Sequence, residues 1–206
     1  MAAQAGSGYF HATLALSGEL FDEWAILWVV MAALGMWCPD HWVRRIGLER
    51  RGVKIALFAL TCAGTGVSML DPAINHVLLF CFIVPGVSAL SHEYSQTRNP
   101  VARRLVVGAL AWFVFAVVCW VNDRLFCEFW TAFAEGYGLK YPQLHAFWHV
   151  AVSVGSYCGC VAMCFFSASK KHTELYPRLR YWPWPSTEFG VPYIKITPPK
   201  LRGKAS

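Results

Sequence analysis

The sequence predicts an all-α fold, a multi-pass bundle of transmembrane helices. Hydrophobic residues make up 56% of the 206 residues and charged residues only 15%, whereas soluble domains typically carry about 25% charged residues. Apolar runs of roughly 17 to 25 residues, the length that crosses a bilayer, recur along the chain. The Lys and Arg residues fall between these runs, which is typical of membrane topology. This distribution argues against a nucleic-acid-binding protein, whose basic residues gather on one folded face.

The first element, residues 1–16, is shorter than a full span. Sixteen helical residues reach about 24 Å, which is less than the roughly 30 Å of the hydrocarbon core. We therefore expect this segment to be the end of a helix whose beginning is missing. Residues 1–7 contain no basic segment of the kind that opens a secretory signal peptide.

Five apolar runs follow, and each is long enough to cross the bilayer. They cover residues 19–37, 53–70, 73–92, 104–122 and 143–167. Asp71 and Pro72 join the second run to the third in a tight hairpin. We therefore expect a transmembrane domain over residues 1–169 and a cytosolic tail over residues 170–206.

The orientation follows from the clustered basic residues, which favour the cytosolic side of a membrane. Lys and Arg gather in or beside loops 38–52 and 93–103 and in the tail, whereas loop 123–142 and the hairpin at Asp71 are poor in them. The basic segments are therefore expected in the cytosol and the other two on the lumenal or exterior side. Residues 181–185 of the tail are rich in Trp and Pro, so the tail is expected to be irregular or interfacial.

Two histidines at the start of the last span have the spacing of metal ligands. His145 and His149 are four residues apart, so a helix projects their imidazoles to one side and can offer two nitrogen ligands to one metal. Ser7 and His11 share this spacing in the N-terminal segment, and Asp22 opens the first full span. The expected topology brings all five side chains to the non-cytosolic end of the bundle.

This set of side chains predicts a catalytic zinc site. Three histidines with an open fourth position are a common arrangement for such a site, and zinc lowers the pKa of a bound water to about 7. A nearby carboxylate can take the proton, and a hydroxyl can hydrogen-bond a developing oxyanion. We therefore expect His11, His145 and His149 to bind zinc, and Asp22 and Ser7 to act in catalysis.

Chemistry alone leaves other interpretations open. A single histidine in an apolar helix is usually a hydrogen-bonded structural residue, and His and Asp within membranes also form proton relays in transporters. Glu23 lies about 100° around the helix from Asp22, so we expect it to cap the helix or to pair. Asp123 and Arg124 end a span and are expected to form a structural salt bridge or cap, with a role in the site as the less favoured alternative.

Six short motifs follow one another along nearly the whole chain. They are Tyr-Phe-His-Ala-Thr-Leu at 9–14, Asp-Glu at 22–23, Asp-Arg at 123–124 followed by Cys127, His-Ala-Phe-Trp-His at 145–149, Arg-Tyr-Trp-Pro at 180–183 and Gly-Val-Pro-Tyr at 190–193. Together they resemble the alkaline ceramidases, in particular the Golgi-type and skin-type branches of that family.

The resemblance implies a seven-helix membrane amidase of the Golgi or endoplasmic reticulum. Its substrate is ceramide within the bilayer, which it cleaves into a sphingoid base and a free fatty acid. The resemblance also implies that His11, His145 and His149 bind zinc, that Asp22 activates the water and that Ser7 assists at the metal.

Family members begin with a lumenal segment that is absent here. That segment carries an acidic Trp-Cys-Glu motif that helps to form a calcium site, and its cysteine pairs with the position of Cys127. We therefore expect an N-terminally truncated chain without this Ca²⁺ site. Two alternatives to the ceramidase are a zinc receptor of the progestin and adiponectin receptor type and an inactive truncated isoform that only pairs with other membrane proteins.

Overall fold

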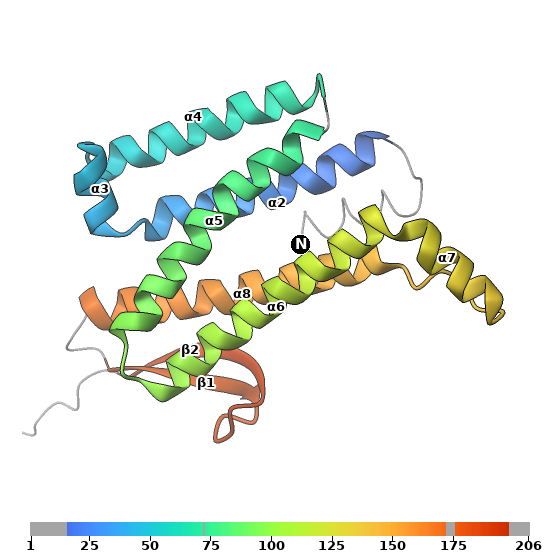
Figure 1. The fold of residues 1–206 in the computed structure, drawn as a ribbon. Coiled ribbons are helices and arrows are strands. Elements are labelled where there is room, and N and C mark those ends of the chain that lie inside the picture. The colour runs from blue at the N-terminus through green and yellow to red at the C-terminus, as the bar shows by residue number, and fades with distance from the viewer. Residues whose placement is uncertain (1–15, 72, 172–175, 198–206) are drawn as a thin grey trace, which may run out of the picture. The chain divides into compact units, whose positions relative to one another are not determined.

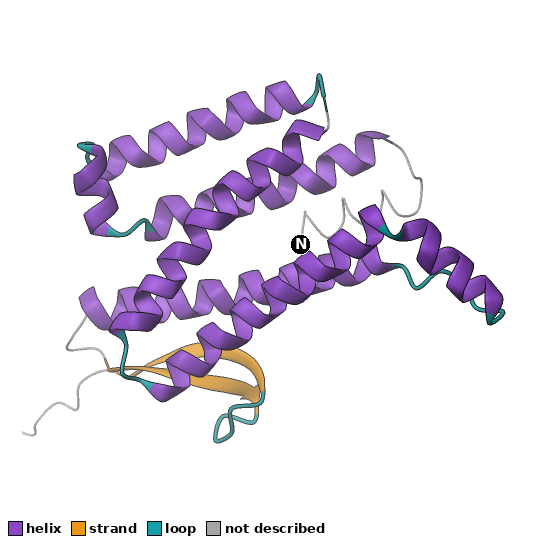
Figure 2. Ribbon diagram, viewed as in Figure 1, coloured by secondary structure: helices purple, strands orange, loops and turns teal. Residues whose placement is uncertain are grey.

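The computed structural model describes residues 16–71, 73–171 and 176–197, and most of them are helical (Figures 1 and 2). The elements are α2 Leu16–Trp37, α3 Asp40–Ile46, α4 Arg50–Ser68, α5 Ala73–Gln96, α6 Pro100–Leu125, α7 Cys127–Gly136, α8 Leu144–Lys171, β1 Tyr176–Pro183 and β2 Gly190–Thr197. The chain divides into two compact units, Met1–Ser91 and His92–Ser206. The predicted helical class is confirmed.

Each of the five predicted apolar runs forms a helix, namely α2, α4, α5, α6 and α8. Within the described residues, three segments are long and apolar enough to cross a membrane: Val77–Gln96, Pro100–Leu125 and Leu144–Lys170. A fourth is formed if α2 and α3, which are bent by 92°, count as one broken span. The basic start of α4 distinguishes that helix from these segments. The apolar helices indicate a membrane protein.

Short helices, α3 and α7, occupy two segments that were expected to be loops. α3 begins with Asp40 and carries Arg44 and Arg45 in its last turn, so charges of the favourable sign lie at both ends of its dipole. Gly47 ends α3 in the left-handed conformation, with φ of 74°, which glycine adopts without steric cost. α7 similarly carries Glu128 in its first turn.

An apolar cluster lies among the described residues of the first unit. Leu27 and Leu34 lie on the same side of α2, seven residues apart, and are buried together with Phe82 of α5. At the edge of this core the Trp24 indole nitrogen donates a hydrogen bond to the Ser68 hydroxyl oxygen, at 2.7 Å. This bond joins α2 to the end of α4.

The second unit is built on α6 and α8, which run side by side in opposite directions (Figure 1). Small residues such as Ala109 and Ala151 are fully buried, and Gly155 lies so close to α6 that an added Cβ would be 3.3 Å from the Ala109 carbonyl oxygen. Small residues let membrane helices approach closely. The other side of α6 exposes apolar residues, including Val114 and Val118, which suits contact with lipid.

Enlarging Gly155 is expected to destabilise the second unit. A leucine at this position overpacks the contact between α6 and α8, at a cost of about 1–3 kcal/mol. Thermal unfolding of the purified chain in detergent should therefore show a lower Tm for Gly155→Leu. The matched control is Gly108→Leu in α6, because a Cβ there meets nothing within 4 Å. Equal Tm values for the two variants would contradict this packing.

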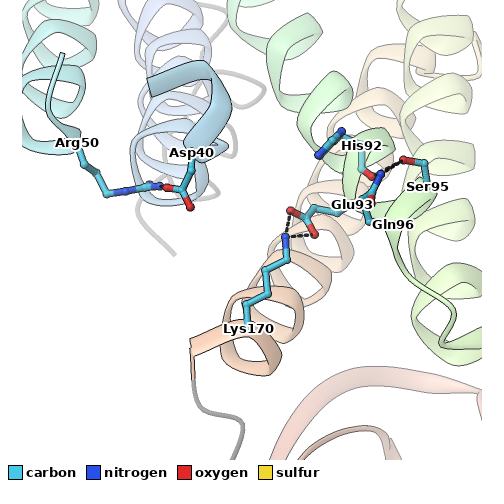
Figure 3. Close-up of polar contacts among 7 residues, drawn as sticks. All are labelled: Asp40, Arg50, His92, Glu93, Ser95, Gln96 and Lys170. Carbon is cyan, nitrogen blue, oxygen red and sulfur yellow. Dashed lines mark hydrogen bonds and ion pairs between the residues drawn. The ribbon is translucent and has the colours of Figure 1, made fainter. Parts of the chain in front are cut away.

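Two ion pairs hold helix ends in place (Figure 3). Arg50 at the start of α4 pairs with Asp40 of α3 within the first unit. In the second unit the Lys170 Nζ lies 2.6 and 2.8 Å from the two carboxylate oxygens of Glu93. Glu93 is only 9% exposed, so Lys170 compensates a carboxylate that is largely removed from solvent.

The prediction of an irregular tail was wrong, because β1 and β2 form an antiparallel hairpin. Aromatic and β-branched residues favour strands. In a two-stranded ribbon both strands are edges, so proline can occupy a position that needs no ladder hydrogen bond. The hairpin is attached to the helices of its unit: the Tyr157 hydroxyl donates to the Pro192 carbonyl at 2.8 Å, and Arg104 pairs with Glu188.

Candidate metal centre

The first two turns of α8 place two imidazoles together, as their spacing predicts. The Nε2 atoms of His145 and His149 are 3.0 Å apart, and both side chains are partly buried. Trp148 is buried beside them, with its ring centroid 4.4 Å from that of His149. Two nitrogens bound to one tetrahedral zinc at about 2.0–2.1 Å are about 3.3 Å apart. The observed separation is therefore close to that of two ligands of one ion.

Asp123, in the last turn of α6, faces Nδ1 of His145, the ring nitrogen that does not face His149. Its Oδ2 atom lies 3.5 Å from His145 Nδ1, and the Tyr141 hydroxyl donates a hydrogen bond to its other oxygen, Oδ1. Burial and the bond to Asp123 raise the pKa of Tyr141, so the phenol stays neutral and remains a donor. For Asp123 we predicted a structural salt bridge or cap, with a role in the site as the less favoured alternative, and its contact with His145 is a finding of the structure.

Asp22 and Glu23 lie in α2 of the first unit. Asp22 is only 3% exposed, and Glu23 is 9% exposed. The Asn75 side chain donates a hydrogen bond to Glu23 Oε2 at 2.9 Å, which confirms that Glu23 is paired. Ionisable side chains buried in apolar helices are costly and usually serve a function. Glu23 therefore has a structural partner in α5, and Asp22 is the more deeply buried of the two carboxylates.

Two predicted site residues, Ser7 and His11, lie outside the described residues. Their assigned roles therefore stay predictions from the sequence. The assignment of Asp22 to the same centre also stays a prediction, because Asp22 belongs to the first unit and the two histidines to the second. His145 and His149 are the predicted ligands whose relative geometry the structure gives.

The donor set on α8 suits zinc. Imidazole nitrogen is a preferred ligand of this ion, and a carboxylate on the second nitrogen of a ligating histidine is a common supporting contact. His145 combines both features, because its Nε2 faces His149 and its Nδ1 faces Asp123. The described part of the centre thus fits a zinc ion in donor type and in spacing.

Comparisons with known proteins agree with the motifs. A family model described as Ceramidase matches residues 1–195. The alkaline ceramidase of Drosophila melanogaster is 35% identical over 200 residues, which cover 97% of this chain and 68% of that protein. Alkaline ceramidase 1 of Homo sapiens is 31% identical over 191 residues, which cover 92% of this chain and 70% of that protein.

A nematode alkaline ceramidase is also similar to this chain. The alkaline ceramidase of Caenorhabditis elegans is 29% identical over 199 residues, with 92% of this chain and 70% of that protein covered. No solved structure matches the chain. The family match confirms the resemblance drawn from the motifs: the chain belongs to the ceramidase family.

Proposed function

We propose that this protein uses a zinc ion to hydrolyse the amide bond of ceramide, releasing a sphingoid base and a free fatty acid. Family membership supports a hydrolase that acts on ceramide amide bonds. The observation that best supports a metal site is the distance of 3.0 Å between the Nε2 atoms of His145 and His149 on α8. Ceramide is a membrane lipid, which is consistent with the apolar helices of the chain.

The proposed ligands are the Nε2 atoms of His145 and His149 together with His11. When bound, zinc would act as a Lewis acid and would lower the pKa of a water molecule bound to it to about 7. A buried carboxylate is suited to take a proton from that water, and we assign this role to Asp22. Ser7 donates a hydrogen bond to the carbonyl oxygen of the substrate as that oxygen gains negative charge.

The proposed reaction consumes one water molecule for each amide bond that is cleaved. The water oxygen bonds to the carbonyl carbon, and the bond between this carbon and the amide nitrogen breaks. The proton held by Asp22 passes to the departing nitrogen, so that the sphingoid base leaves as an amine. We place this reaction in the membrane of the Golgi or endoplasmic reticulum, with the C-terminus in the cytosol.

The match over residues 1–195 favours the hydrolase over the receptor of the progestin and adiponectin type. The two functions differ in turnover, because a receptor binds its ligand without cleaving it. An inactive form differs from both, since it neither cleaves ceramide nor needs the metal.

Metal removal tests the proposal directly. The purified chain in detergent micelles is given ceramide with a labelled acyl chain, and both products are measured. We expect equal amounts of fatty acid and sphingoid base, loss of turnover after dialysis against a chelator, and recovery when zinc is restored. Turnover that persists without metal would contradict the zinc centre. A zinc-loaded chain that releases no product would contradict the hydrolase.

A further inference from the structure

The two ring nitrogens of His145 have different neighbours. Nε2 lies 3.0 Å from Nε2 of His149, whereas Nδ1 lies 3.5 Å from Asp123 Oδ2. A neutral imidazole carries its proton on one nitrogen only, and the nitrogen without the proton is the one that can bind a metal. The neighbour of Nδ1 therefore helps to decide whether Nε2 is available.

A carboxylate can accept a hydrogen bond and cannot donate one while it is ionised. Asp123 therefore favours the tautomer with the proton on Nδ1, which leaves the lone pair of Nε2 toward His149. A separation of 3.5 Å places the two atoms at the outer limit of a hydrogen bond, so the carboxylate is a neighbour that acts on Nδ1.

The carboxylate of Asp123 is itself held in place. The Tyr141 hydroxyl, from the segment between α7 and α8, donates to Oδ1, and Oδ2 is the oxygen that faces His145. Only 18% of the Asp123 side chain is exposed, so water competes little for these contacts. The three residues come from the end of α6, the connecting segment and the start of α8, all within the second unit.

We infer that Asp123 is a positioning residue for the metal ligand His145, with Tyr141 fixing the Asp123 carboxylate; this inference rests on the proposed function. Asp123 does not touch the metal or the substrate. It fixes the tautomer and the ring orientation of His145, so that zinc binds more tightly than to an unsupported pair of histidines. Such supporting contacts typically account for about 10- to 100-fold in metal affinity or activity.

Zinc affinity of Asp123 variants tests the inference with the full chain in detergent micelles. We expect Asp123→Ala to weaken zinc binding by about 10- to 100-fold, measured by competition with a chelator of known affinity. Asp123→Asn keeps an oxygen that can accept from Nδ1–H, so it should recover a large part of the affinity. Tyr141→Phe should have a smaller effect in the same direction.

The matched control is Asn122→Ala in the same turn of α6. The Asn122 side chain accepts a hydrogen bond from the Trp130 indole nitrogen at 3.0 Å, so its removal weakens the helix end without removing a contact to His145. The control should retain wild-type zinc affinity. Cobalt-substituted protein gives a second measurement, because the visible bands of tetrahedral Co²⁺ should change in Asp123→Ala and stay unchanged in the control.

Two results would overturn the inference. One is wild-type zinc affinity in Asp123→Ala, and the other is an equal loss of affinity in Asp123→Ala, Asp123→Asn and Asn122→Ala, which would indicate a merely structural role. A different result would contradict the proposed function: a wild-type chain that binds zinc and does not cleave ceramide. If the wild-type chain binds no zinc, both the inference and the zinc centre are wrong.

Discussion

We expect the His149→Ala variant to retain no zinc and to lose ceramide cleavage. Removing one of two imidazoles that meet at 3.0 Å breaks the pair on α8, and a metal held by the remaining ligands dissociates more readily. The stabilisation that a metal gives to a transition state amounts to several kcal/mol, so the rate should fall by at least about 10³-fold. Zinc per chain and product release are measured on the same purified sample.

His92→Ala provides the control for this experiment. His92 is an exposed residue of α5 and carries no role in the proposed centre. Its replacement removes an imidazole of the same chemistry and should leave both zinc content and turnover near the wild-type values. If His149→Ala retained normal zinc and normal turnover, the ligand assignment would be wrong.

The second large effect is expected for Asp22→Asn, which should keep the metal and lose turnover. An amide has nearly the shape of the carboxylate but cannot take a proton from water at neutral pH. General base catalysis typically contributes about 10²- to 10⁴-fold, so a loss of this size is expected with a zinc content near one ion per chain.

Glu23→Gln is the matched control, because Glu23 is the next residue and is also buried. The amide oxygen of Gln can still accept the hydrogen bond that Asn75 donates, so turnover should be close to that of the wild-type chain. Loss of zinc in Asp22→Asn would show instead that Asp22 is a ligand or a structural residue. Equal loss of turnover in both variants would remove the special role of Asp22.

Much of the fold could be predicted because membrane helices leave a local signal. Each apolar run became a helix, and the turn at Asp71 separates α4 from α5. The hairpin of the tail was missed because the Trp- and Pro-rich residues 181–185 favoured an irregular segment, whereas Pro183 is part of β1. Only pairing between two edge strands makes proline acceptable there, and that pairing is a tertiary feature that a local pattern does not contain.

The candidate centre shows the same limit. The shared side of His145 and His149 follows from helix geometry alone, so their spacing predicted it. Asp123 and Arg124 lie in the last turn of α6, where charged residues are common at an ordinary helix end. Its contacts with Tyr141 and His145 depend on how the end of α6 meets the start of α8. In the sequence, Asp123 begins a loop on the expected non-cytosolic side, where His145 is also expected, and this shared side is the signal that could have suggested a role in the site.

X-ray absorption at the zinc edge of the purified wild-type chain tests whether the imidazoles of His11, His145 and His149 hold one zinc ion. We expect one zinc per chain, with three imidazole nitrogens and one oxygen at about 2.0–2.1 Å. A spectrum with sulfur ligands at about 2.3 Å, or a purified chain that holds no zinc after supply of the ion, would contradict it.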